Sequence, residues 1–156
     1  MTQRRIHIAV SGAGSCSQSV GELAEEVGRE IARRQAVLVC GGLGGVMEAA
    51  ARGARAVGGL TVGILPTYDH NRANEWLDVV IPSGLGHARN VLVVASGDAV
   101  IALPGEHGTA SEIALALKLG RCVVALGAWQ DYPGVLPAAS PAEAVAYAIA
   151  SAGRTA

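Results

Sequence analysis

Short runs of branched apolar residues recur along this chain, and each ends at a turn that is followed by a helical pattern. In residues 100–112, for example, the run Val-Ile-Ala-Leu stops at Pro104-Gly105, and helix formers with apolar residues at helical spacing resume from Glu112. Such runs predict strands that are buried on both faces. Because strands alternate with helices, we expect an α/β fold in which a parallel sheet carries helices on both faces.

About six strands are expected, at residues 6–10, 36–40, 60–65, 77–81, 98–103 and 122–126. The first helix is expected to begin at Ser19, with Glu22 completing a capping box. The last helix has Ser140 as cap, Pro141 at its first position and Gly153 past its end. Since 156 residues with 51% hydrophobic content can bury one sizeable core, we expect a single three-layer Rossmann-like domain over residues 1–156.

The composition excludes several classes of partner. The formal net charge is -1 at pH 7, which provides no overall field for nucleic acid or an acidic membrane. No apolar run approaches the roughly 20 residues of a membrane span, and the run at 6–10 is too short for a signal-peptide core. The 3 cysteines lack CxxC spacing and fit reduced, mostly buried thiols. We therefore expect a cytoplasmic protein without a nucleic-acid or membrane partner.

The turn that leads to Glu112 is the first candidate site. A strand that turns through glycines into a helix leaves backbone N–H groups unpaired at the positive end of the helix dipole, where anions bind. Pro104, Gly105, Gly108, Thr109 and Glu112 are then candidate ligand-binding residues. Thr109 followed three positions later by Glu112 is also a capping box, which requires no ligand. Both interpretations stay open.

Two further glycine turns follow predicted strands. Gly12, Gly14 and Ser15 belong to a dinucleotide fingerprint that lacks its third glycine, and no acidic residue after the next strand is placed to hold a ribose. NAD binding is therefore rejected. The turn after the second strand is a candidate anion nest, and the alternative is a turn that merely needs positive φ. Its candidate ligand-binding residues are Gly41, Gly42, Gly44, Gly45 and Met47.

Arg89 and Asn90 fall in the first turn of a predicted helix and are also candidate ligand-binding residues. A cation in this position opposes the helix dipole at a cost of roughly 0.3–1 kcal/mol, so we expect Arg89 to have an anionic partner. That partner is Glu112, a ligand phosphate, or both. His87 and His107 lack acidic or thiolate partners at metal-ligand spacing, so no metal site is expected.

Three ordered motifs resemble those of the SMF/DprA-LOG superfamily. They are Cys40-Gly-Gly-Leu-Gly-Gly-Val-Met-Glu48, Gly86-His-Ala-Arg-Asn90 and Pro104-Gly-Glu-His-Gly-Thr-Ala-Ser-Glu112. Together they extend the resemblance over nearly the whole chain, and the molybdenum-cofactor carrier branch is the most similar. Three motifs in matching order are far more specific than one glycine-rich loop.

The resemblance implies how the elements are arranged. The usual strand order of the superfamily, with right-handed crossovers, would place the first and fourth strands side by side, where ligands bind at the carboxyl ends of strands. The loops at Gly12, Gly41, Arg89 and Gly105 would then open onto one crevice. The superfamily also implies a homo-oligomer, either a dimer or a tetramer.

The superfamily implies two functions. LOG phosphoribohydrolases cleave nucleoside 5′-monophosphates to base and ribose 5-phosphate, and the resemblance then implies Arg89 and Glu112 as catalytic residues. Carriers bind a pterin phosphate, so that the molybdenum cofactor would be cargo and no cofactor would be required. A PLP-dependent lysine decarboxylase is excluded, because the only lysine, Lys118, lies near the end of its helix and away from the glycine turns.

Two departures from the motifs favour the carrier. Glu106 replaces the second motif glycine, and a carboxylate there repels a phosphate unless it points to solvent. Asn90 stands where LOG enzymes usually carry lysine. We therefore expect a carrier-like protein that binds a phosphorylated heterocycle, either a pterin phosphate or a nucleotide, with the phosphoribohydrolase as the alternative. Residues 66–76 lack a regular period and are either a binding loop or plain surface.

Overall fold

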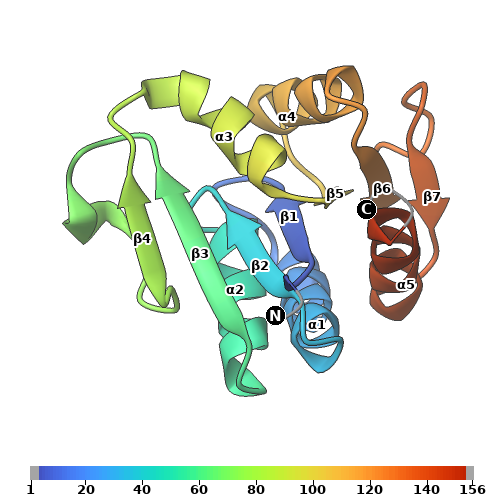
Figure 1. Ribbon diagram of the computed structural model, residues 1–156, viewed down its shortest axis with the longest axis horizontal. Helices are drawn as coiled ribbons and strands as arrows, with labels where there is room; N and C mark the ends of the chain where they lie inside the picture. The colour runs from blue at the N-terminus through green and yellow to red at the C-terminus, as the bar shows by residue number, and fades with distance from the viewer. Residues whose placement is uncertain (1–3, 154–156) are drawn as a thin grey trace.

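A computed structural model describes residues 4–153. Seven strands in this part of the chain form one parallel sheet (Figure 1). In sheet order the strands are β4-β3-β2-β1-β5-β6-β7. Their bounds are β1 His7–Ser11, β2 Val37–Cys40, β3 Leu60–Leu65, β4 Val79–Pro82, β5 Ala99–Ala102, β6 Cys122–Leu126 and β7 Leu136–Ala138.

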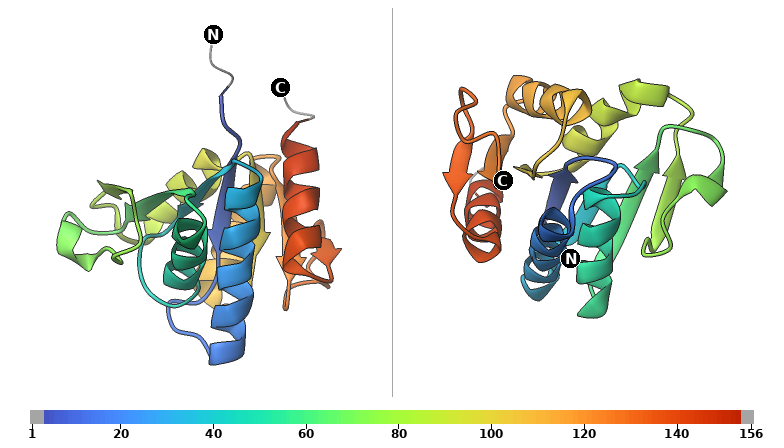
Figure 2. Two further views of the ribbon diagram at one scale, coloured as in Figure 1. Left: turned by 90° about the horizontal axis from the view of Figure 1, so that it is seen from below. Right: turned by 180° about the vertical axis from the view of Figure 1, so that it is seen from behind.

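Helices cover both faces of the sheet, so the expected three-layer α/β fold is confirmed (Figure 2). α1, α2 and α5 pack on one face, and α3 and α4 pack on the other. The α-helices are α1 Gln18–Arg33, α2 Val46–Ala56, α3 Arg89–Ser96, α4 His107–Lys118 and α5 Pro141–Ala152, with short 3₁₀ helices at His70–Arg72 and Gly86–Ala88. Over residues 4–153, no helix has the length and apolar character needed to cross a membrane.

The central strands bury both of their faces, as their continuous apolar runs predict. In β5, Ala99 and Ile101 pack into the core beneath α1, α2 and α5. Val100 and Ala102 alternate with them and pack into the core beneath α3 and α4. The two cores hold the carboxyl ends of the central strands in fixed positions.

α1 and α2 approach one another closely because glycines and alanines line their contact. A Cβ atom at Gly28 would lie 1.9 Å from the carbonyl oxygen of Ala50, and one at Gly53 would lie 1.9 Å from that of Glu25. Larger side chains at these positions would force the helices apart. Most alanines of α2 therefore pack inside this protomer. The buried ones are Ala49, Ala50, Ala51 and Ala54.

The number and order of the strands differ from the expectation. β7 is an additional strand, which the sequence pattern does not predict because its three residues include a proline and are largely exposed. The expected pairing of the first and fourth strands is wrong, since β1 pairs with β2 and β5. β4 instead extends the sheet beyond β3, at its edge. The switch in strand order, where ligands bind in such folds, therefore lies between β1 and β5.

The first helix begins slightly earlier than expected, whereas the last begins as expected. Ser17, not Ser19, caps α1, and its hydroxyl accepts a hydrogen bond from the backbone N–H of Val20. Ser140 caps α5 and accepts a hydrogen bond from the N–H of Glu143. Serines close together in sequence leave the first cap ambiguous, whereas Ser140 stands alone before a proline.

Candidate functional site

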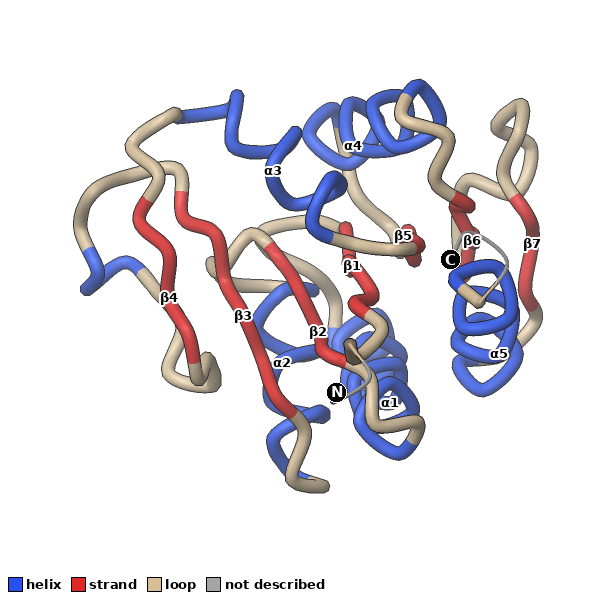
Figure 3. Tube along the Cα trace, viewed as in Figure 1, coloured by secondary structure: helices blue, strands red, loops and turns tan. Residues whose placement is uncertain are grey.

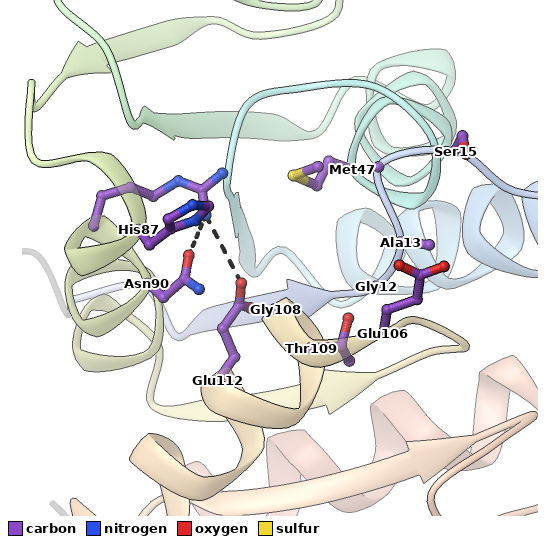
Figure 4. Close-up of a pocket in the computed structure, with 12 residues that line it drawn as sticks. Gly12, Ala13, Ser15, Met47, His87, Asn90, Glu106, Gly108, Thr109 and Glu112 are labelled. Atoms are coloured by element: carbon purple, nitrogen blue, oxygen red, sulfur yellow. Dashed lines mark hydrogen bonds and ion pairs between the residues drawn. The ribbon is translucent and has the colours of Figure 1, made fainter.

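The loops that follow β1 and β5 leave the same edge of the sheet (Figure 3). A cavity of about 260 Å³ lies at this edge. It is lined by the loop after β1, the start of α2 and the N-terminal turns of α3 and α4 (Figure 4). The sequence-predicted residues that line it are Gly12, Gly14, Ser15, Met47, Arg89, Asn90, Gly108, Thr109 and Glu112. The fold thus brings together residues from turns far apart in the sequence.

Other sequence-predicted residues lie outside the lining of this cavity, namely Gly41, Gly42, Gly44, Gly45, Pro104 and Gly105. Ala13, His87 and Glu106 line it without having been predicted as site residues. Each of these three lies within two positions of a predicted site residue, and this closeness in sequence is the signal that could have identified them.

The Arg89 side chain is buried at the start of α3. The residue is 8% exposed, and its Nη1 donates a hydrogen bond to Oδ1 of Asn90. Nη2 donates to the carbonyl oxygen of Gly41 at 3.4 Å, and the buried Nε has no hydrogen-bond partner among residues 4–153. Burial lowers the pKa of the guanidinium, and the carboxylate of Glu112 partly offsets this effect. The described part of the chain therefore satisfies this cation incompletely.

Glu112 is the anionic partner of Arg89. Its Oε1 lies 3.9 Å from Nη1 of Arg89 (dashed line in Figure 4), and the residue is 8% exposed. Burial raises the pKa of Glu112, while the Ser11 hydroxyl and the Arg89 cation act in the opposite direction. The Ser11 hydroxyl is itself buried and makes no hydrogen bond of normal geometry to the described residues. The carboxylate is thus held in the cavity by a long ion pair.

The N-terminal end of α4 opens at the cavity without a side-chain cap. Glu106 occupies the N-cap position, and no side chain there accepts from the first backbone N–H groups. Thr109 and Glu112 both lie inside the helix and are buried, so their interpretation as a capping box is wrong. The first turn of a helix has N–H groups without acceptors inside the helix, and they carry partial positive charge.

The glycine turn between β2 and α2 supports the loop after β1. Gly42 and Gly45 have φ angles of 79° and 62°. The turn therefore needs glycine for its positive φ angles, as the alternative to an anion nest predicts. The N–H of Val46 donates to the carbonyl oxygen of Ala13 at 2.9 Å, and a Cβ atom at Gly45 would lie 2.3 Å from that oxygen. The start of α2 is therefore occupied by the neighbouring loop, and this turn forms the support of a cavity wall.

The loop after β5 is held from two sides. The carbonyl oxygen of Pro104 accepts a hydrogen bond from the N–H of Ala13 at 3.0 Å, and a Cβ atom at Gly105 would lie 3.0 Å from the same nitrogen. Trp129, in the loop between β6 and β7, donates through Nε1 to the carbonyl oxygen of Leu103 at 3.0 Å. These contacts fix the path by which the chain enters α4.

Other candidate features lie away from the cavity. Tyr68 is 79% exposed, and no residue of the segment 66–76 lines this cavity. Pro66 lines a neighbouring hollow together with His87 and Arg89. Residues 4–153 contain no group of three or more His, Cys, Asp or Glu side chains placed to hold a metal ion.

Cys40 is buried and Cys122 is partly buried, but Cys16 is exposed, so the expectation of mostly buried thiols is wrong for Cys16.

The fold and sequence are similar to those of two characterised kinds of protein. The molybdenum cofactor binding protein of the phototrophic bacterium Rippkaea orientalis matches with a TM-score of 0.88 and 34% identity, over 96% of this chain and 98% of that chain. A cytokinin riboside 5′-monophosphate phosphoribohydrolase of Rhodococcoides fascians is 40% identical over 108 residues, which cover 67% of this chain. The match covers 53% of that enzyme, so the chain spans about half of its length.

Two further matches cover nearly the whole chain. An uncharacterized protein of Archaeoglobus fulgidus is 46% identical over 146 residues, which is 94% of this chain and 96% of that protein. The family model of the SLOG cluster4 family matches residues 5–152. The superfamily resemblance carried by the three motifs is confirmed, and the chain belongs to the SLOG cluster4 family.

Proposed function

We propose that this protein binds a phosphorylated heterocycle in the cavity beside Arg89 and acts as a carrier. The observation that carries the proposal is the Arg89 guanidinium, which lines the cavity, is buried, and has an Nε atom without a partner among the described residues. A buried cation with unpaired donors is unfavourable unless an acceptor completes its hydrogen bonds. A phosphate group suits this position, because a guanidinium binds phosphate oxygens through several N–H donors.

The N-terminal turn of α4 supports the same ligand. It lines the cavity through Gly108 and Thr109, and no side chain caps it. Backbone N–H groups at the positive end of a helix attract phosphate. We therefore place the phosphate between Arg89 and the first turn of α4.

Gly14 and Gly108 also support a ligand that comes close to the backbone. Neither has a positive φ, and a Cβ atom at either position would meet no other protein atom within 4 Å. Packing inside the protein therefore does not require glycine at these positions, in contrast to Gly45. Close approach of a ligand to the main chain is a use of glycine that fits both.

The relatives favour a carrier over an enzyme. The molybdenum cofactor binding protein matches over nearly its entire length, whereas the phosphoribohydrolase matches over about half of its own. We propose a pterin phosphate, such as the molybdenum cofactor, as the cargo. The phosphate of such a cargo would face Arg89, and the pterin would lie against the loop after β1.

A nucleoside 5′-monophosphate phosphoribohydrolase is the second candidate, and Glu112 is the observation that favours it. Its carboxylate lines the cavity beside Arg89, and burial raises its pKa. Carboxyl groups with shifted pKa values are common where charge develops or protons move. In this function, water would replace the base at C1′ of the ribose, Glu112 would stabilise the developing positive charge, and Arg89 would hold the phosphate.

Incubation of the purified protein with AMP or GMP, followed by chromatography for free base, separates the two functions. A fluorescence assay for bound oxidised pterin runs beside it. We expect bound pterin and no released base. Steady release of base that disappears in Glu112→Ala and persists in the control Glu48→Ala would contradict the carrier function and support the phosphoribohydrolase. If the protein releases no base and binds no pterin or nucleotide, both proposed functions are contradicted.

A further inference from the structure

Glu106 is the charged side chain of the cavity lining that neither function uses. It stands at the N-cap position of α4 but its side chain does not cap the helix, and its carboxylate makes no hydrogen bond or ion pair with residues 4–153. In Figure 4 its carboxylate is drawn near Ala13, apart from Asn90 and Glu112. Glu106 is exposed, so its carboxylate is hydrated at the rim of the cavity, and its acceptors are available to a ligand.

The backbone that carries Glu106 is fixed against the loop after β1. Ala13 donates its N–H to the carbonyl oxygen of Pro104 at 3.0 Å, and Gly105 packs against the same nitrogen. Arg89 belongs to the opposite helix, α3. The cavity lining thus combines the buried Arg89 cation at the start of α3 with the exposed Glu106 carboxylate at the start of α4.

This arrangement limits the chemistry of the ligand. An ionised carboxylate accepts hydrogen bonds and donates none, and the same is true of a fully ionised phosphate, so the two repel when adjacent. The ligand group beside Glu106 must instead present hydrogen-bond donors, either N–H or O–H. Two parallel donors match the two oxygens of a carboxylate best.

Pterins and guanine share a ring edge with this property. Their 2-amino-4-oxopyrimidine ring presents a ring N–H beside an exocyclic amino group, which are two donors pointing in the same direction. Hypoxanthine has the ring N–H without the amino group. Adenine offers an amino group beside a ring nitrogen that accepts hydrogen bonds.

We infer that Glu106 is a specificity-determining residue that accepts hydrogen bonds from the 2-amino-4-oxopyrimidine edge of the ligand. The inference rests on the proposed phosphate binding at Arg89 and adds the class of heterocycle. The ring lies against residues 12–15, where Gly14 leaves open space, and the phosphate lies toward Arg89. Pterin and guanine phosphates are therefore preferred over phosphates of hypoxanthine or adenine.

Calorimetric titration with GMP and IMP tests this inference, because the two nucleotides differ only in the 2-amino group. We expect GMP to bind roughly ten-fold or more tightly than IMP, the effect of one hydrogen bond to a charged group. In Glu106→Gln and Glu106→Ala the difference should fall to within about two-fold, because the charged acceptor is lost. Glu48→Gln is the matched control, since Glu48 stands in the first turn of α2 and outside this cavity. It should keep the full preference.

Equal affinities for GMP and IMP in the unaltered protein would overturn the inference, and so would a preference that persists in both Glu106 variants. If GMP, IMP and AMP all bind equally well, phosphate binding stands and only the role of Glu106 fails. If none of them binds, and no pterin phosphate binds either, the proposed function fails together with the inference. Thermal melting of each variant verifies that it is folded.

Discussion

Nη1 of Arg89 lies 3.9 Å from Oε1 of Glu112, within the range of an ion pair but too far for a hydrogen bond. Both residues are 8% exposed, so each has lost most of its hydration. Burial shifts both pKa values toward the neutral forms, downward for Arg89 and upward for Glu112. A pair this weakly joined can be separated by a ligand anion that hydrogen-bonds to Arg89.

Glu112→Gln should leave the melting temperature near that of the parent protein. Glutamine keeps the shape of the side chain and removes a desolvated charge, but it also removes the opposite charge beside Arg89, so the two effects oppose each other. Thermal unfolding followed by circular dichroism measures the outcome. A loss of about 3–5 kcal/mol, as when a strong buried ion pair is broken, would show that Glu112 is chiefly structural.

The stability difference between the parent and Glu112→Gln should depend on pH. The pKa of folded Glu112 is raised above its ordinary value of 4.5, so folding favours the protonated form. The stabilising contribution of this group is fully present below the ordinary value and is lost as the pH rises through the raised pKa. Acidification from about pH 7 to about pH 5 should therefore stabilise the parent relative to the variant. If the melting temperatures of the parent and the variant change with pH in parallel over this range, the raised pKa of Glu112 is contradicted.

Arg89→Ala should weaken GMP binding by about 1–3 kcal/mol, or roughly five- to 150-fold, because a buried charge-assisted contact is lost. Calorimetric titration measures the change. Arg55→Ala is the control, since Arg55 pairs with Asp78 and does not line the cavity. Equal affinity in Arg89→Ala and the parent would exclude Arg89 as the phosphate contact.

Gly108→Ala and Gly45→Ala should have opposite effects on stability. Gly108 lies in α4 with open space around it, so alanine should raise stability by about 0.5–1 kcal/mol while reducing ligand affinity. Gly45 has φ 62° and lies against Ala13, so alanine should destabilise the fold by more than about 2 kcal/mol. Melting temperatures paired with GMP titrations separate these effects. Unchanged affinity in Gly108→Ala would remove the support that this glycine gives to a bound ligand.

A homo-oligomer stays a prediction, and we expect exposed apolar residues in and just before α3 to contribute to its interface. Leu85, Val91 and Leu92 are 52%, 39% and 38% exposed. Light scattering after size exclusion should give a multiple of the 15.7 kDa protomer mass, and Val91→Glu should shift it toward one protomer. A single protomer at micromolar concentration in the unaltered protein would contradict the prediction.

The sequence predicts strands well where several buried apolar residues stand in a row. β3 and β6 begin and end where their apolar runs do, at residues 60–65 and 122–126. An apolar run shows that a strand is buried but not which strand lies beside it, so the place of β4 at the sheet edge could not be predicted. β7 has no apolar run, and its position depends on pairing with β6.

The candidate site is predictable in part. Arg89 and Glu112 line one cavity, as their motifs imply. Thr109 and Glu112 are three positions apart, a spacing shared by a capping box and by one face of a helix, and the residue at which the helix begins decides between them. The role of Gly45 depends on its contact with Ala13, which is distant in sequence and leaves no local pattern.

The hydrogen bond from Trp129 to the carbonyl oxygen of Leu103 provides an intrinsic optical reporter of the site. The chain has 2 tryptophans, and the other, Trp76, does not line the cavity. Trp76→Phe would leave a single indole, tied to the residue just before Pro104. A ligand that moves the entrance to α4 would change the surroundings of this indole and hence its emission, so binding could be followed in real time without a label on either molecule.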